Sequence, residues 1–431
     1  MVETTLPTGG ADTLAQPQFA PVQTQGAEAE QTIILADPSR DQSVLPFSFH
    51  ATEEDLADLK RRIAATRWPS QELVNDASQG VQLATIQKLA DYWLNEHDWR
   101  SVEARINSYP NFITNIDGLD IHFIHVKSKH SNALPLIVTH GWPGSVIEQL
   151  KIIEPLTNPT AYGGSEADAF DVVIPSMPGY GFSGKPAETD WGPERIASAW
   201  ATLMSRLGYT HYVASGGDWG ALITDFMGVQ APPGLAGIHT NMAGAIPPEI
   251  DALVEKGAPA PDWLDEEEKY SFDHVSFFYK HGLGYALEMG NRPQTLYGIE
   301  DSPVGLAAWI LDHDIWTYRQ IVGVFDGVTE GFSRDDILDN ITLYWLTRTG
   351  ISSARLYWEN KKPFFAPKGV AIPVVVSAFP EEICPTPRKW AEKAYPKLVY
   401  YKSHPKGAHF AAFEQPQALV EDSRAGFRSL R

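Results

Sequence analysis

A five-residue segment, Gly216-Gly217-Asp218-Trp219-Gly220, constrains the fold of this chain more than any other. It follows a run typical of a β-strand, Tyr212 to Ser215, and it precedes a helical stretch, Ala221 to Gln230. Small residues spaced around a reactive side chain in this way are typical of the tight strand-to-helix turn that carries a catalytic nucleophile, because glycine tolerates the strained backbone. Such a turn would push the Asp218 side chain into the site. Taken alone, the segment also fits a glycine-rich turn in which Asp218 caps a helix.

Strand-like and helical segments alternate on both sides of this turn. The strand-like segments are Ile121 to Val126, Leu136 to Thr139, Asp171 to Pro175, Tyr212 to Ser215 and Val374 to Ser377. Helical stretches such as Arg195 to Leu207 separate the middle ones, and this alternation predicts an α/β core with a mostly parallel sheet. Between about Gly237 and Pro363 aromatic-rich helical sequence replaces the alternation. An insertion at this point would lie over the carboxyl ends of the strands, where α/β proteins bind ligands, so we expect a largely helical cap at 237–363 between core parts at 117–236 and 364–431.

The chain ahead of the core divides into two pieces. Residues 1–45 are rich in Thr, Gly, Ala, Pro and Gln and have little periodic hydrophobicity, which predicts a loose leader without a chemical role. Residues 46–116 are expected to form an N-terminal helical extension. Its first helix is indicated by Thr52 and Asp55, which resemble a capping box, and by apolar residues that follow at helical spacing.

Composition excludes several classes of function. The formal net charge of −20 disfavours nucleic acid and anionic membrane surfaces as partners, because both attract basic patches. Cys384 is the only cysteine, so neither an internal disulfide nor a thiolate-rich metal site is expected. No segment approaches the roughly 18 consecutive apolar residues of a membrane helix, and residues 1–45 lack the apolar core of a signal peptide. We therefore expect a soluble, cytoplasmic protein without an integral membrane anchor, and the sequence leaves a homodimer open.

Two further segments stand where a hydrolytic site needs them. His140-Gly141-Trp142-Pro143-Gly144 follows a strand at the position that supplies one backbone N–H of an oxyanion hole, which makes Trp142 one candidate donor and Trp219 the other. His409 lies near the C-terminus, where the chain order of nucleophile, acid and histidine places the catalytic base. The chain has no HExxH pair and no cysteine cluster, so we expect neither a metal nor another cofactor.

One motif is interpreted as a turn and not as a nucleotide site. Gly179 to Gly184 matches the dinucleotide fingerprint G-x-G-x-x-G and follows a strand. However, Lys185-Pro186 follows in place of a helix start, and no acidic residue ends a second strand nearby.

Taken together, these segments resemble the microsomal-type epoxide hydrolases, from about Pro46 to the C-terminus. The segments that carry the resemblance are HGWPG at 140–144, SMPGYGFSG at 176–184, GGDWG at 216–220, DSPVGLAAWI at 301–310, SAFPEEI at 377–383 and GAHFAAFEQP at 407–416. The resemblance implies an α/β-hydrolase fold with the N-terminal extension of that family. It also implies an enzyme that converts a small-molecule epoxide and water to a vicinal diol, without a cofactor.

The resemblance assigns a role to each polar residue of these segments. Asp218 would be the nucleophile, His409 the base, and Glu382 the acid that orients His409. Glu381 lies beside Glu382, but the spacing to His409 and the alignment of the FPxE segment favour Glu382.

Two tyrosines of the expected cap carry over as proton donors to the epoxide oxygen. They are Tyr285, in the segment LGYALE, and Tyr357, in the segment RLYWEN. Tyr297 and Tyr344 compete for these assignments, and core packing alone would also explain a tyrosine at any of these positions.

A carboxylate nucleophile suits an epoxide better than a serine does. Displacement at the sp³ carbon by serine would leave an ether, whereas a carboxylate forms an ester whose carbonyl water can attack in a second step. A haloalkane dehalogenase shares the aspartate turn but needs halide-binding donors, a role that Trp142 and Trp219 keep open. A catalytically silent binding protein with the same fold is the alternative from another functional class.

Overall fold

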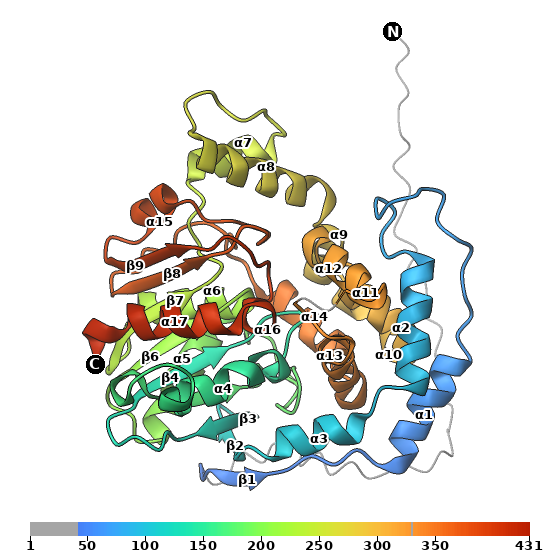
Figure 1. Cartoon of the computed structure of the whole chain (residues 1–431), viewed down its shortest axis with the longest axis horizontal. Coiled ribbons are helices and arrows are strands. Elements are labelled where there is room, and N and C mark those ends of the chain that lie inside the picture. Colours follow the sequence, from blue (N-terminus) through green and yellow to red (C-terminus); the bar gives the residue numbers. More distant parts are fainter. Residues whose placement is uncertain (1–41, 329–330) are drawn as a thin grey trace, which may run out of the picture.

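A nine-stranded sheet forms the centre of the computed structural model, which describes residues 42–328 and 331–431 (Figure 1). The strands are β1 (Leu45–Phe47), β2 (Asn111–Ile116), β3 (Leu119–Val126), β4 (Leu134–Thr139), β5 (Phe170–Pro175), β6 (Tyr212–Gly216), β7 (Leu235–Thr240), β8 (Val374–Ala378) and β9 (Leu398–Ser403). Their order in the sheet is β1-β2-β3-β5-β4-β6-β7-β8-β9. Strands β5, β4, β6, β7, β8 and β9, which are neighbours in this order, pair in parallel. At the other edge β1 pairs antiparallel with β2, β2 with β3, and β3 with β5. The predicted α/β-hydrolase fold with a mostly parallel sheet is therefore confirmed.

The central strands are buried on both faces, as parallel strands covered by helices must be. Every residue of β6 and β8 is buried, and β8 begins with three consecutive valines, whose branched side chains suit a buried strand. β9 at the sheet edge has only exposed and half-buried positions. The hydrophobic core therefore lies around β4, β6 and β8, whose carboxyl ends hold the segments of the expected site.

Helices cover both faces of the sheet. The helices are α1 (Glu53–Ala64), α2 (Leu83–Asn95), α3 (Trp99–Asn107), α4 (Leu150–Thr157), α5 (Pro193–Arg206), α6 (Trp219–Gln230), α7 (Pro248–Glu255), α8 (Glu266–His281), α9 (Gly284–Asn291), α10 (Tyr297–Asp301), α11 (Pro303–Leu311), α12 (Ile315–Phe325), α13 (Arg334–Thr347), α14 (Gly350–Glu359), α15 (Arg388–Ala394), α16 (Ala411–Glu414) and α17 (Pro416–Gly426). Short 3₁₀ helices accompany them in the described residues: η1 (Val146–Gln149), η2 (Pro159–Ala161), η3 (Glu166–Asp168), η4 (Pro293–Thr295) and η5 (Arg428–Leu430). α4 and α17 pack together on one face of the sheet, and α5 and α6 pack together on the other (Figure 1).

The insertion between β7 and β8 is helical, and its start differs from the prediction. Helices α7 to α14 follow one another between these two strands (Figure 1). The boundary expected at Gly237 falls inside β7, which pairs with β6 on one side and β8 on the other. The insertion therefore begins after Thr240. β7 was missed because Gly237 and His239 interrupt the apolar, β-branched pattern by which a buried strand is recognised.

The N-terminal extension joins the sheet to the cap. Its strands β1 and β2 lengthen the sheet, while α1, α2 and α3 pack against cap helices α11, α12 and α13 (Figure 1). A buried hydrogen bond from Trp93 Nε1 to Thr342 Oγ1, 2.9 Å long, fixes α2 to α13. The predicted capping box is present, since the Thr52 side chain accepts from Asp55 N and the Asp55 carboxylate accepts from Thr52 N.

Two further expectations concern the leader at the start of the chain and membrane-spanning helices. Of the predicted loose leader, residues 1–41 lie outside the described residues. Within the described part of the chain, no helix is both long and apolar enough to cross a membrane.

Candidate active site

The turn around Asp218 has the strained geometry that its glycines predict. Asp218 joins β6 to α6 with φ at 52° and ψ at −125°, a conformation that non-glycine residues rarely adopt. A Cβ atom on Gly220 would lie 2.0 Å from the Thr139 carbonyl oxygen, and one on Gly216 would lie 2.2 Å from the Gly220 carbonyl oxygen. Only glycine therefore fits at either position. The close packing lets the turn present Asp218 above the carboxyl end of the sheet.

The Asp218 carboxylate lies between the loop at residues 140–144 and His409. Trp142 N donates a 2.7 Å hydrogen bond to Oδ1, and His409 Nε2 lies 3.6 Å from Oδ2. Burial would raise the pKa of Asp218, but the hydrogen bond and charge of His409, the charge of His313 and the Trp142 N–H together hold it below its ordinary value. The group is therefore a carboxylate at neutral pH, although only 6% of Asp218 is exposed.

His409 is held on its other side by Glu382. The two are joined by a 2.6 Å contact between His409 Nδ1 and Glu382 Oε1, which also accepts from Ile383 N at 2.8 Å. Burial would lower the pKa of His409, yet the two carboxylates beside it raise that pKa well above its ordinary value. Glu381, the neighbouring candidate, is exposed. The geometry thus joins Asp218, His409 and Glu382 in one buried chain of contacts.

The two cap tyrosines lie against the tryptophans that flank Asp218 in the site. Tyr285 of α9 stacks on Trp142 with ring centroids 5.0 Å apart, and Tyr357 of α14 packs edge-on against Trp219 at 4.6 Å. Their own rings lie 6.0 Å apart. Burial and the charge of Asp218 raise the pKa of Tyr285 well above its ordinary value, and burial, Tyr285 and Asp218 do the same for Tyr357. Both phenols are therefore protonated at neutral pH and can donate.

The competing tyrosines lie elsewhere. Tyr297 is 67% exposed. Tyr344 is buried, but its hydroxyl donates to the Gly144 carbonyl at 2.8 Å and so supports the backbone of the 140–144 loop. Neither position offers a free buried phenol.

The glycines at 179–184 serve packing. No helix begins directly after them, since the next α-helix, α5, starts at Pro193. The Gly179 carbonyl instead accepts from Ser352 Oγ of α14 at 2.6 Å, and a Cβ atom on Gly179 would lie 2.9 Å from the Ser352 carbonyl oxygen. This loop therefore fixes the cap to the core. A dinucleotide-binding loop would instead lead directly into the N-terminus of a helix.

Comparison with known proteins identifies the family of this chain. The family model "Epoxide hydrolase N terminus" matches residues 44–149, and the model of the α/β hydrolase fold matches residues 135–287. A relative from Stigmatella aurantiaca (strain DW4/3-1) is 49% identical over 392 residues, which are 90% of this chain and 86% of that protein. Epoxide hydrolase 1 of Oryctolagus cuniculus is 38% identical over 400 residues, 89% of this chain and 88% of its own. This chain belongs to the microsomal-type epoxide hydrolase family.

A solved structure agrees with the family assignment. The juvenile hormone epoxide hydrolase of the silkworm Bombyx mori superposes with a TM-score of 0.81 at 31% identity, covering 91% of this chain and 96% of that one. The agreement extends over the sheet, the cap and the N-terminal extension, because so little of either chain is left out. The protein is thus a hydrolase of this family along nearly its whole described length.

Sequence reasoning missed several buried polar residues that lie near Asp218 and His409. His313 packs against His409 with ring centroids 4.5 Å apart, and its Nδ1 lies 2.9 Å from Asp314 Oδ2. Asp218, His313 and His409 bring three potential metal-ligand atoms within 4.8 Å of one another, although two of these side chains already form the Asp218–His409 contact. Nothing in the spacing of His313 along the chain signals this position, because it reaches the site from the cap. Two others, Glu148 and Gln149, line a cavity beside the nucleophile and are taken up below.

Proposed function

We propose that this protein opens a small-molecule epoxide with water to give a vicinal diol, through an ester on Asp218. The observation that carries the proposal is the position of the Asp218 carboxylate, which contacts Trp142 N and His409. The Trp142 ring in turn contacts both cap tyrosines, Tyr285 and Tyr357, and the Trp219 ring contacts Tyr357. Nucleophile, base and proton donors thus surround one point between the core and the cap. We also propose that helices α7 to α14 act together as the cap that closes this site.

In the first half-reaction, Asp218 attacks an epoxide carbon through Oδ2. The C–O bond of the epoxide breaks, and the oxygen that leaves the carbon takes a proton from one of the two tyrosines. Donors placed where charge develops lower the barrier of such a step. Trp142 N keeps Oδ1 in place, so that Oδ1 becomes the carbonyl oxygen of the ester.

In the second half-reaction, His409 activates a water molecule against the ester carbonyl. Glu382 fixes the ring and stabilises the imidazolium that forms, while the N–H groups of Trp142 and Trp219 receive the negative charge on Oδ1. Formation of the ester prepares this step, because it removes the Asp218 charge that helps to raise the pKa of His409. The pKa of His409 then falls, the ring passes its proton to the tyrosinate left by the first half-reaction, and the neutral ring becomes available as a base.

The experiment that tests the function is a screen of the purified protein against a panel of aryl and alkyl epoxides. Diol release would support the proposal, and halide release from matched haloalkanes would favour the dehalogenase chemistry instead. Ligand binding without any turnover would favour a silent binding protein.

We further propose a cytoplasmic enzyme that does not bind nucleic acid and works as a monomer or homodimer. Cell fractionation, nucleic-acid binding assays and sedimentation would check these three points in turn.

Replacing both cap tyrosines is expected to slow ester formation far more than ester hydrolysis. Each single change, Tyr285→Phe or Tyr357→Phe, leaves one donor and should cost about tenfold in the alkylation rate, and the double change at least about 100-fold. Stopped-flow measurement of both half-reactions provides the check. Tyr297→Phe, at an exposed position, is the matched control and should stay within about twofold of wild type. Normal alkylation in the double variant would remove the tyrosines from the mechanism.

Two adjacent substitutions test which glutamate orients His409. Glu382→Gln removes the charge that stabilises the imidazolium and should slow ester hydrolysis about 100-fold. Glu381→Gln changes an exposed carboxylate and should leave the rate within about twofold of wild type. Single-turnover kinetics of both variants make the comparison, and equal effects, or the larger effect in Glu381→Gln, would contradict the assignment.

A further inference from the structure

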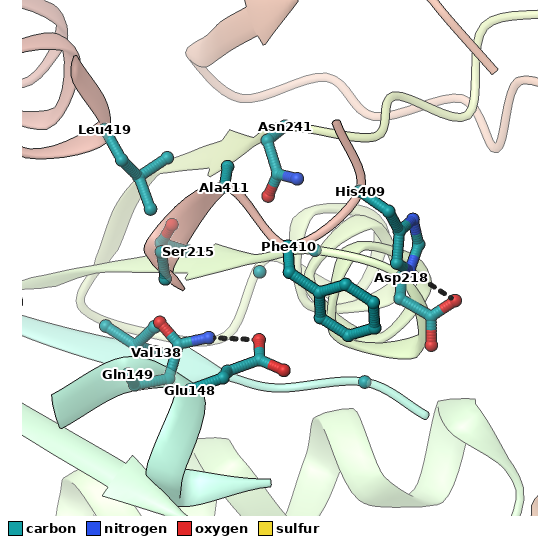
Figure 2. Close-up of a pocket in the computed structure, with 14 residues that line it drawn as sticks. Val138, Glu148, Gln149, Ser215, Asp218, Asn241, His409, Phe410, Ala411 and Leu419 are labelled. Carbon is teal, nitrogen blue, oxygen red and sulfur yellow. Dashed lines mark hydrogen bonds and ion pairs between the residues drawn. The ribbon is translucent and has the colours of Figure 1, made fainter. Parts of the chain in front are cut away.

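A small cavity lies beside the nucleophile, on the core side of the site. Its volume is about 20 Å³, and its lining includes Gly141, Glu148, Gln149, Asp218, Asn241 and His409. A volume of this size holds about one water molecule, and a buried water needs two to four polar partners. Figure 2 shows Glu148 and Gln149 of η1 on one side of the cavity and the Asp218–His409 pair on another.

Gln149 presents an unused acceptor in this buried region. Its Nε2 donates to Glu148 Oε1, whereas its Oε1 is buried without a protein hydrogen-bond partner. A buried acceptor is costly to leave unsatisfied, and bound water is the usual remedy. The bond to Glu148 fixes the amide, so that the oxygen and not the nitrogen remains available.

Glu148 fits beside this amide because of a glycine and because of its protonation. A Cβ atom on Gly144 would lie 1.7 Å from Glu148 Oε2, so only a glycine there leaves room for the carboxyl group. Burial raises the pKa of Glu148 to about 8, and the carboxyl group is thus mostly neutral at pH 7. A neutral group can stay close to Asp218 without repelling its charge.

We infer that Gln149 binds the hydrolytic water in this cavity and that Glu148 is a positioning residue that holds the Gln149 amide. The inference rests on the proposed function, whose second half-reaction consumes that water. Nothing in the sequence motifs or the family resemblance assigns a role to either residue.

The water would donate one hydrogen to Gln149 Oε1 and the other to His409 Nε2, which leaves a lone pair directed at Asp218 Cγ. In the reaction, the O–H bond toward His409 breaks, its proton passes to Nε2, and the new O–Cγ bond pushes an electron pair onto Oδ1. The bond from Cγ to the product oxygen then breaks, and that oxygen takes the proton from His409. The water oxygen remains on Asp218 as part of a carboxylic acid, and this acid returns its proton to His409, which restores the starting carboxylate and imidazolium.

The test is the single-turnover kinetics of Gln149→Met, which keeps the length of the side chain but removes the acceptor. Ester formation should match wild type, and ester hydrolysis should slow about tenfold, the effect of one lost hydrogen bond to the attacking water. Unchanged alkylation also shows that the variant folds with an intact site. Gln417→Met, at an exposed glutamine, is the matched control for the chemical change and should alter neither step.

Glu148 is tested by two variants. Glu148→Gln keeps an oxygen that can accept from the Gln149 amide, so it should hydrolyse the ester within about threefold of wild type, whereas Glu148→Met should resemble Gln149→Met. Equal loss in both would mean that the acidic proton of Glu148 acts directly, and it would overturn the positioning role.

The outcomes separate this inference from the proposed function. If wild type forms an ester and Gln149→Met hydrolyses it at the normal rate, the water site is wrong while the function stands. If alkylation in Gln149→Met slows as much as hydrolysis, the role is not confined to water and the inference also fails. If wild-type protein forms no ester with any reactive epoxide, the proposed function itself fails.

Discussion

Intact-protein mass spectrometry of the His409→Gln variant, mixed with a reactive epoxide, is expected to find one substrate mass added to each chain. His409 lies 3.6 Å from Asp218 Oδ2 and is proposed to activate water, a task that the alkylation step does not require. The variant should therefore form the ester and fail to release it, with hydrolysis slowed at least about 1,000-fold. Peptide mapping should place the added mass on the peptide that contains Asp218.

A second buried histidine supplies the control for this experiment. His404 also contacts a carboxylate, with Nε2 2.6 Å from Asp422 Oδ2, but His404 lies in the loop after β9, Asp422 lies on α17, and the pair does not contact Asp218. His404→Gln should lose stability without trapping an adduct, because it breaks a buried pair and leaves the site intact. An adduct that accumulates equally in both variants, or in neither, would contradict the role given to His409.

The tight turn at Asp218 was predictable because its constraint is local. Gly216 and Gly220 are required by contacts within a few residues of Asp218 and with the adjoining strand β4, so the spacing of the glycines carries the information. The capping box at Thr52 is local in the same sense. Strand β7 was harder, because its identity comes from its neighbours β6 and β8 and not from its own composition.

The remaining site residues depend on contacts between distant segments. Glu381 and Glu382 have the same chemistry and adjacent positions. Only the conformation of the loop after β8 buries Glu382 against His409 and leaves Glu381 exposed. Gln149 and His409 line one cavity although they are separated by most of the chain. No periodicity or spacing encodes such a meeting, so Gln149 and His313 became visible only once the sheet, cap and C-terminal loop were placed together.

Replacing Asp218 with Ala is expected to abolish diol formation, with a loss of at least about 10⁴-fold in kcat/KM. No other carboxylate contacts both Trp142 N and His409 among the described residues, so no group can take over the attack. The fold should survive, since the side chain projects from the turn and contributes a buried charge instead of core packing. We expect the free energy of unfolding to change by no more than about 1 kcal/mol, because the lost ion contact is offset by relief from burying that charge. Denaturant unfolding and a diol assay on the same preparation give both values.

Asp225, a buried carboxylate on helix α6, which directly follows Asp218, makes the comparison specific. It accepts from the Tyr395 hydroxyl at 3.1 Å and takes no part in the proposed reaction, so Asp225→Asn should keep the activity of the folded fraction.

An isotope experiment then tests whether Asp218 attacks the epoxide itself. In a single turnover of wild-type enzyme in ¹⁸O-labelled water, the oxygen delivered to the diol should come from the unlabelled carboxylate, and the label should appear first in the Asp218 peptide. Label in the diol of the first turnover would mean that Asp218 acts as a base for direct attack by water, because covalent catalysis transfers the carboxylate oxygen before any solvent oxygen reaches the product.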